Sequence, residues 1–201
     1  MRFNRTQLLD RTVQKRDARL FLIATEGERT EPDYFHELQS RAIIDRSRTK
    51  IEVIPTSDGS SAPEYVLGRL NAIASRYQLA DFDRCWLVID YDRWGGGKLA
   101  QVTQLASQKA YATAVSRPCF ELWLILHVTD DHGLTATSSP EECKARWRAV
   151  RPASQHFPMR EQVGTAIDRA QALEPSAAQA QRWPAGVGTR VFQLVSELLG
   201  R

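Results

Sequence analysis

The chain has 201 residues, of which 42% are hydrophobic and 25% are charged, and its formal net charge is +3 at pH 7. These values are typical of one globular domain and exclude disordered, collagen-like and disulfide-scaffold proteins. The sequence has no apolar run near 18 residues, no export signal and no CxxC pair among its three cysteines. We therefore expect a cytoplasmic protein with reduced thiols and no membrane partner.

The first 18 residues form a predicted basic arm. Residues 1–19 carry six basic and two acidic side chains, whereas the remainder of the chain is close to neutral. Such an arm could follow the phosphates of DNA or RNA. A solvated tail explains the same charges equally well.

Short buried strands alternate with helices over the first two thirds of the chain. The strand patterns cover residues 20–24, 50–54 and 85–89, with a weaker one at 109–115. The helices are expected from a capping box at Thr30 to about Ile44, around 66–73, from the residue after Gly97 to Ser107, and over 118–127. This alternation predicts an α/β fold with a mostly parallel sheet flanked by helices.

The last third of the chain is predicted to be helical. A second capping box stands at Ser139–Glu142, and an apolar stripe at helical spacing runs over 191–199. We therefore expect an α/β core over residues 19–136 and a helical extension over 137–201 that packs on the same domain.

Acidic residues follow two of the predicted strands. Glu26 comes after the first strand, and Asp90 and Asp92 come at the end of the third. Active sites of open α/β sheets lie at the carboxyl ends of the strands, and side chains two apart on an extended segment point the same way. If the first and third strands are neighbours, the three carboxylates can meet at one Mg²⁺ ion. An ordinary polar loop is the alternative.

Two other patterns have structural interpretations. Asp81 and Asp83 repeat the Asp-x-Asp spacing but precede the third strand, so they lie at the opposite edge of the sheet and are interpreted as a turn or cap. Gly95–Gly97 is interpreted as a flexible loop, since it lacks the GxGxxG spacing of a dinucleotide site.

The sequence resembles the RloB-like proteins, a branch with a TOPRIM-type (Rossmann-like) fold, over residues 16–199. The resemblance is carried by FLIATEGERTEPDYF at 21–35, VIDYD at 88–92, SRPCFELWLILH at 116–127 and GTRV at 188–191. Arg117 stands where the third motif usually has Asn. The resemblance implies a Mg²⁺-dependent nuclease of restriction and phage-defence loci, often encoded beside an AAA or ABC-type ATPase.

The resemblance also assigns roles to single residues. It makes Glu26 the TOPRIM glutamate and Asp90 and Asp92 the metal ligands, and it adds Glu121 as a further catalytic carboxylate. In phosphodiester hydrolysis, Glu26 would serve as general acid/base beside Mg²⁺, or Mn²⁺ in its place. The cations that could stabilise the charge of the transition state are Arg29, Lys98 and Arg117.

Several residues near these motifs also have structural interpretations. Glu28 and Glu31 also suit the first turn of a helix, and His127 suits a buried core position. We expect a nuclease for DNA or RNA that works with an ATPase, in an oligomeric state that the sequence leaves open. The alternatives are a non-catalytic effector or regulatory subunit that binds a nucleotide or the ATPase and, more weakly, a phosphotransferase.

Overall fold

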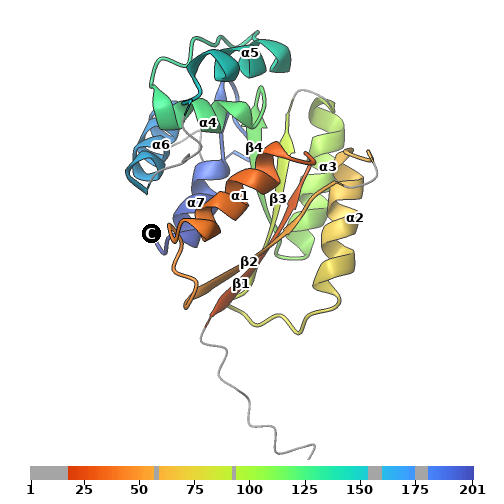
Figure 1. The fold of residues 1–201 in the computed structure, drawn as a ribbon. Helices are drawn as coiled ribbons and strands as arrows, with labels where there is room; N and C mark the ends of the chain where they lie inside the picture. Colours follow the sequence, from red (N-terminus) through yellow and green to blue (C-terminus); the bar gives the residue numbers. More distant parts are fainter. Residues whose placement is uncertain (1–17, 57–58, 92–93, 154–159, 175–180) are drawn as a thin grey trace, which may run out of the picture.

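A computed structural model describes residues 18–56, 59–91, 94–153, 160–174 and 181–201. Within these ranges the chain forms one sheet with the strand order β2-β1-β3-β4-β5 (Figure 1). The strands are β1 (Arg19–Thr25), β2 (Thr49–Ile54), β3 (Arg84–Asp90), β4 (Ala112–Arg117) and β5 (Gly188–Thr189). Strands β1 to β4 run parallel and β5 is antiparallel to β4, which confirms the predicted mostly parallel sheet.

Helices flank both faces of the sheet. They are α1 (Thr30–Ser40), α2 (Pro63–Ala74), α3 (Gly95–Gln108), α4 (Glu121–Val128), α5 (Pro140–Val150), α6 (Arg160–Ala172) and α7 (Val191–Leu198). Figure 1 shows α2 and α3 on one face and α1 and α7 on the other, with α4, α5 and α6 grouped beyond α1. No helix in the described ranges is both long and apolar enough to cross a membrane.

The central strands are buried on both faces. Phe21 and Ile23 of β1 belong to an apolar cluster with α1, α4 and α7, whereas Leu20 and Leu22 belong to a second cluster with α2 and α3. A parallel strand covered on both sides is apolar throughout rather than alternating, which is why these segments were recognisable as strands. Each fully buried aliphatic side chain contributes roughly 1.5–3 kcal/mol.

The carboxyl-terminal part of the chain returns to the sheet. Thr189 of β5 shares a hydrogen bond with Ser116 of β4 (2.8 Å), and the Arg190 N–H donates to the Val115 carbonyl (2.8 Å). Helices α5, α6 and α7 contribute to the same apolar cluster as α1 and β1. Of the predicted basic arm, only Ala18 is among the described residues.

Three helix boundaries can be compared with those predicted from local sequence patterns. The capping box at Ser139 is confirmed, because Ser139 accepts from the Glu142 N–H while the Glu142 side chain accepts from the Ser139 N–H. The one predicted at Thr30 is wrong: Thr30 is already helical, and no side chain caps the helix. Helix α1 also ends at Ser40 rather than Ile44, since Ala42 adopts a positive φ of 52°.

The glycine run is a further correction. Gly95–Gly97 forms the first turn of α3 and is not a loop. The buried side chains of Leu99, Val102 and Ala106 hold this helix against the sheet. This packing overrides the weak helix propensity of the glycines.

Candidate active site

The ends of β1 and β3 bring Glu26 and Asp90 together. The two strands are parallel neighbours, with Thr25 in register with Val88, and the Glu26 N–H donates to the Val88 carbonyl (3.1 Å). Oε2 of the buried Glu26 accepts from the Asp90 N–H at 3.0 Å, and Oε1 accepts from Nε1 of Trp94 at 3.1 Å. The expectation that the first and third strands are neighbours is therefore confirmed.

Glu31 joins this pair from the first turn of α1. The chain turns sharply after β1, so the Gly27 N–H donates to Oε1 of Glu31 at 3.1 Å. The Glu31 side chain is buried, with 6% of its surface exposed. Glu31 therefore belongs to the group of carboxylates at the strand ends as well as to the first turn of α1.

These carboxylates line one cavity of about 250 Å³ at the carboxyl edge of the sheet. Glu121 reaches it from the start of α4, and the exposed Lys144 reaches it from α5. The charged lining residues are Glu26, Glu28, Arg29, Glu31, Asp90, Glu121 and Lys144. Acidic side chains therefore outnumber basic ones around this cavity.

The crowding of carboxylates changes their protonation. Burial, together with the charges of Glu121 and Glu26, raises the pKa of Glu31 from 4.5 to about 7. Burial likewise raises the pKa of Asp90 well above its usual value, with repulsion from Glu31, Glu26 and Glu121 added to it, while Lys144 lowers it. Such a cluster is stabilised by protons or by a bound cation.

The donor chemistry of the cavity fits a hard divalent cation. Mg²⁺ prefers oxygen ligands, and in nucleotide-processing sites it is held by one or two carboxylates, several waters and substrate phosphates. Glu26 and Asp90 supply such a pair, because a carboxylate that accepts two N–H bonds keeps lone pairs for a metal. In the described ranges no three acidic, His or Cys side chains are arranged as a ligand set, and Asp92 lies outside those ranges.

The three predicted phosphate-binding cations have different surroundings. Arg29 is exposed and lines the cavity beside α1. Lys98 pairs with Glu64 (2.7 Å) and lies 5.0 Å from the centre of the Trp94 ring. These contacts tie Lys98 to α2 and to Trp94, and it does not line the cavity.

Arg117 is held in a similar way. Its guanidinium lies 4.5 Å from the centre of the Tyr91 ring and donates to the Ala185 carbonyl at 2.7 Å. Arg117 thus contacts Tyr91, and Lys98 contacts Trp94. These two aromatic residues stand before and after Asp92 in the sequence. Both cations flank the cavity without lining it.

Asp83 and His127 have structural roles. Asp83 accepts from the N–H groups of Leu20 and Ala80, both at 2.8 Å, which confirms the predicted turn. His127 is buried between the Trp123 carbonyl and the Tyr34 hydroxyl, and burial lowers its pKa to about 3. It remains a neutral core residue across physiological pH.

Sequence reasoning missed Glu31 and Lys144 as lining residues. Glu31 belongs to the TEGERTEP motif but was interpreted as a favourable charge at a helix terminus. Lys144 stands on a polar helix face, and no local pattern marks it. Its place over the carboxyl edge depends on how α5 packs against α4.

Comparison with known proteins adds one match. The model of a family described as RloB-like protein matches residues 21–198, from β1 to the end of α7. No curated protein and no solved structure matches the chain. The matched range includes every residue that lines the cavity.

Proposed function

This chain belongs to the family of RloB-like proteins, and on that premise we propose that it is a TOPRIM-type nuclease that hydrolyses phosphodiester bonds of DNA or RNA with Mg²⁺ or Mn²⁺. One observation carries the proposal: Glu26, Glu31, Asp90 and Glu121 converge on one cavity at the carboxyl edge of a parallel sheet. Like charges gathered in this way repel one another, whereas a phosphoryl-transfer site needs them to hold a cation.

In the proposed reaction, different residues bind the cation and the substrate phosphate. Asp90 and Glu26 hold the cation, together with Asp92 as the further ligand that the sequence predicts. When bound, the metal polarises the phosphoryl oxygen and lowers the pKa of water. The guanidinium of Arg29 and the ammonium of Lys144 bind the phosphate oxygens of the substrate from the rim of the cavity.

Proton transfer is assigned to Glu31. Its pKa of about 7 allows its carboxyl group to hold or release a proton near neutral pH, as an efficient general acid or base requires. Both oxygens of Glu26 accept N–H bonds, so Glu26 is better suited to cation binding than to proton transfer. Glu121, at the first position of α4, adds charge that keeps the Glu31 pKa high.

The wider role rests on the family alone. We propose that the nuclease acts in antiphage defence in the cytoplasm and that an AAA or ABC-type ATPase controls it. The chain has no GxxxxGK[ST] motif, so ATP hydrolysis would come from that partner.

The alternative is a non-catalytic subunit that binds a nucleotide or the ATPase. The lack of a three-ligand set among the described side chains favours it. In that case the carboxylates would hold β1, β3 and α1 together without binding metal.

Cleavage and metal binding together test the proposal. Plasmid DNA and total tRNA are incubated with the purified protein and Mg²⁺ or Mn²⁺, and Mg²⁺ binding is measured by calorimetry. Glu26→Gln and Asp90→Asn are expected to abolish both. Asp81→Asn is the matched control, because this exposed aspartate belongs to the Asp-x-Asp pair at the other edge of the sheet.

The two readouts separate the candidates. Metal-dependent cleavage that both variants lose supports the nuclease and identifies the polymer. Mg²⁺ binding without cleavage, lost in the same variants, supports the site and indicates that a partner activates it. An intact protein that neither binds Mg²⁺ nor cleaves contradicts the nuclease and favours the non-catalytic subunit.

A further inference from the structure

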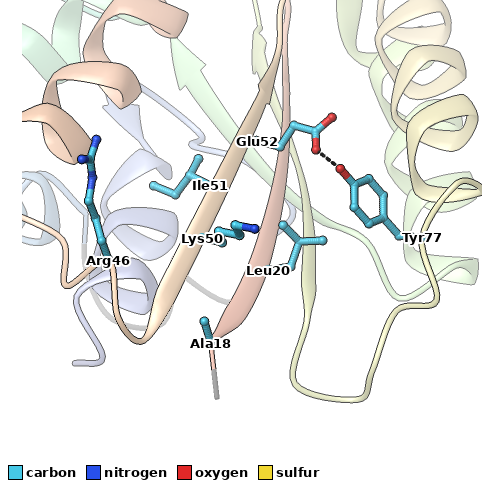
Figure 2. Close-up of a pocket in the computed structure, with 7 residues that line it drawn as sticks. All are labelled: Ala18, Leu20, Arg46, Lys50, Ile51, Glu52 and Tyr77. Carbon is cyan, nitrogen blue, oxygen red and sulfur yellow. Dashed lines mark hydrogen bonds between the residues drawn. The ribbon is translucent and has the colours of Figure 1, made fainter. Parts of the chain in front are cut away.

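Strand β2 forms one edge of the sheet. It lies between α1 and α2 and has a neighbour on one side only, β1 (Figure 1). Beside it lies a hollow of about 460 Å³, lined by residues of β1 and β2 together with Arg46 and Tyr77 (Figure 2). The Gln39 side chain of α1 contacts this edge at the Ile51 carbonyl, but no described strand pairs with it, and an open strand edge readily pairs with another chain.

The backbone direction along β2 follows from two hydrogen bonds. The carbonyl of Arg48, just before the strand, accepts from the Arg19 N–H of β1 at 2.8 Å. The carbonyl of Ile51 accepts instead from the side chain of Gln39 at 3.1 Å. Because successive residues of a strand face opposite neighbours, Thr49, Ile51 and Val53 direct their backbone groups away from β1.

The side chains of β2 divide between the two faces of the sheet. Ile51 and Val53 pack against the apolar cluster on the α1 face. Lys50 and Glu52 lie on the other face, where the Tyr77 hydroxyl donates to the Glu52 carboxylate (Figure 2). The edge thus carries an apolar row on one face and two opposite charges on the other.

We propose that this edge pairs with the same edge of a second copy of the chain, antiparallel and with Ile51 opposite the partner's Ile51, so that the partner's Ile51 N–H replaces the Gln39 side chain at the Ile51 carbonyl. In that register Lys50 stands opposite the partner's Glu52, and Glu52 opposite the partner's Lys50. On the other face Val53 meets the partner's Thr49 beside the two isoleucines. Opposite charges and β-branched side chains directly across a strand pair are stabilising.

The charges select this register. A shift of two residues in one direction places Lys50 opposite the partner's Lys50, and a shift in the other direction places Glu52 opposite the partner's Glu52. A shift of one residue sets outward backbone groups against inward ones. Charged residues usually protect an edge from pairing, but here their order permits one twofold arrangement.

The inference does not depend on the proposed nuclease function. Strand β2 has 6 residues, so the contact area is small and the dimer should dissociate on dilution. Antiparallel pairing also directs the carboxyl edges of the two sheets in opposite directions. The two cavities would then lie far apart, with neither completing the other.

Exchange of the charges tests the pairing. The molar mass of the full chain is measured by sedimentation or light scattering from about 1 μM to about 100 μM, the range in which small interfaces associate. The unmodified protein is expected to form a dimer as concentration rises. Lys50→Glu and Glu52→Lys should each weaken the dimer by about tenfold or more, because two attractive pairs become repulsive.

Two further samples make the test specific. A mixture of the two single variants restores opposite charges across the interface, as does the double variant Lys50→Glu/Glu52→Lys, so both should regain the dimer. Glu141→Lys, on the exposed surface of α5, should leave it unchanged. A monomer at every concentration overturns the proposal, and so does a dimer whose stability the single exchanges leave unchanged. The proposal is also overturned if neither the mixture nor the double variant restores the dimer.

Discussion

The Glu31 carboxylate lies directly over the backbone of Gly27. The Gly27 N–H donates to Oε1 of Glu31 at 3.1 Å, and a Cβ atom built on Gly27 would overlap Oε2. Any side chain at this position between β1 and α1 would therefore displace the Glu31 carboxylate. This contact fixes the position of the carboxylate to which we assign proton transfer.

The substitution Gly27→Ala should expel Glu31 from its position. The methyl group cannot share the space of the carboxylate, so the Glu31 side chain moves and loses its hydrogen bond to the Gly27 N–H, and the free energy of unfolding should fall by about 0.5–1.5 kcal/mol. Metal affinity and any nuclease activity should fall with it. Urea denaturation and calorimetry with Mg²⁺ measure these effects.

The matched control is Gly68→Ala. Gly68 stands inside α2, and a Cβ atom there has no atom within 4 Å. Alanine should stabilise the helix by about 0.5–1 kcal/mol, the opposite sign. Destabilisation in both variants would contradict the specific clash, and an unchanged Gly27→Ala protein would contradict the close approach.

A second prediction concerns pH. The pKa of Glu31 rises from 4.5 to about 7 on folding, so between these values the folded protein binds more protons than the unfolded chain. Its contribution to stability therefore falls as pH rises from about 4.5 to about 7 and is constant above. Glu31→Gln removes this penalty, so the variant should gain stability relative to the unmodified protein across that window.

The difference in free energy of unfolding between the two proteins is the quantity to measure, because it cancels groups common to both. Without metal it should grow with pH by at most about 1.4 kcal/mol per unit. Mg²⁺ should shrink the penalty by compensating the charge of the ionised carboxylate. A difference independent of pH would mean that Glu31 has an ordinary pKa.

The third prediction separates cation binding from phosphate binding. Lys144 lowers the pKa of Asp90 and lines the cavity, so its charge repels a metal and attracts a phosphate. Lys144→Met should strengthen Mg²⁺ binding but weaken nucleic-acid binding, and the slope of log affinity against log salt should fall by about one. Lys109→Met, exposed at the end of α3, is the control. Parallel changes in both affinities would contradict the assignment.

The fourth prediction excludes His127 from proton transfer. Its Nδ1–H donates to the Trp123 carbonyl at 2.8 Å, so its Nε2 accepts from the Tyr34 hydroxyl at 3.2 Å. Because its pKa is lowered to about 3, NMR should show no titration of this ring between pH 5 and 8. Tyr34→Phe removes a buried donor and should cost about 1–3 kcal/mol. A ring that titrates near pH 6.5 would contradict the core assignment.

The linkage for His127 has the opposite sign to that for Glu31. The unfolded chain takes up a proton at this histidine near pH 6.5, whereas the folded protein resists it down to about pH 3. The stability that His127 contributes is therefore lost as pH falls through that window. The stability curve of Glu31→Gln, which lacks the slope from Glu31, should therefore show this opposite slope more clearly.

Patterns within single elements predicted most of the fold. Strands β1 and β3 are recognisable because burial on both faces makes them apolar throughout, and their order along the chain implies parallel pairing. The two residues of β5 have no such pattern, since tertiary contacts with Ser116 and Val115 define that strand. The loop predicted at Gly95–Gly97 was wrong for a related reason, because packing further along α3 makes the glycines helical.

The site was predictable where it follows from topology. Glu26 and Asp90 meet because the ends of neighbouring parallel strands meet. Glu31 and Lys144 were missed because their roles depend on a tight turn and on a helix–helix contact, neither of which leaves a periodic signal. Arg117 and Lys98 could be identified as cations, but the aromatic rings that hold them could not.

The long separation along the chain between β1 and α7, which pack together, constrains how the protein is made. The buried residues Val191, Leu194 and Val195 cover a sheet face whose other elements are synthesised much earlier. Until those residues leave the ribosome, that apolar face has no cover, and the nascent chain is exposed to aggregation and to chaperones. Burial of this sheet face is therefore a late step, and a chain that stops before α7 is expected to be a substrate for quality control.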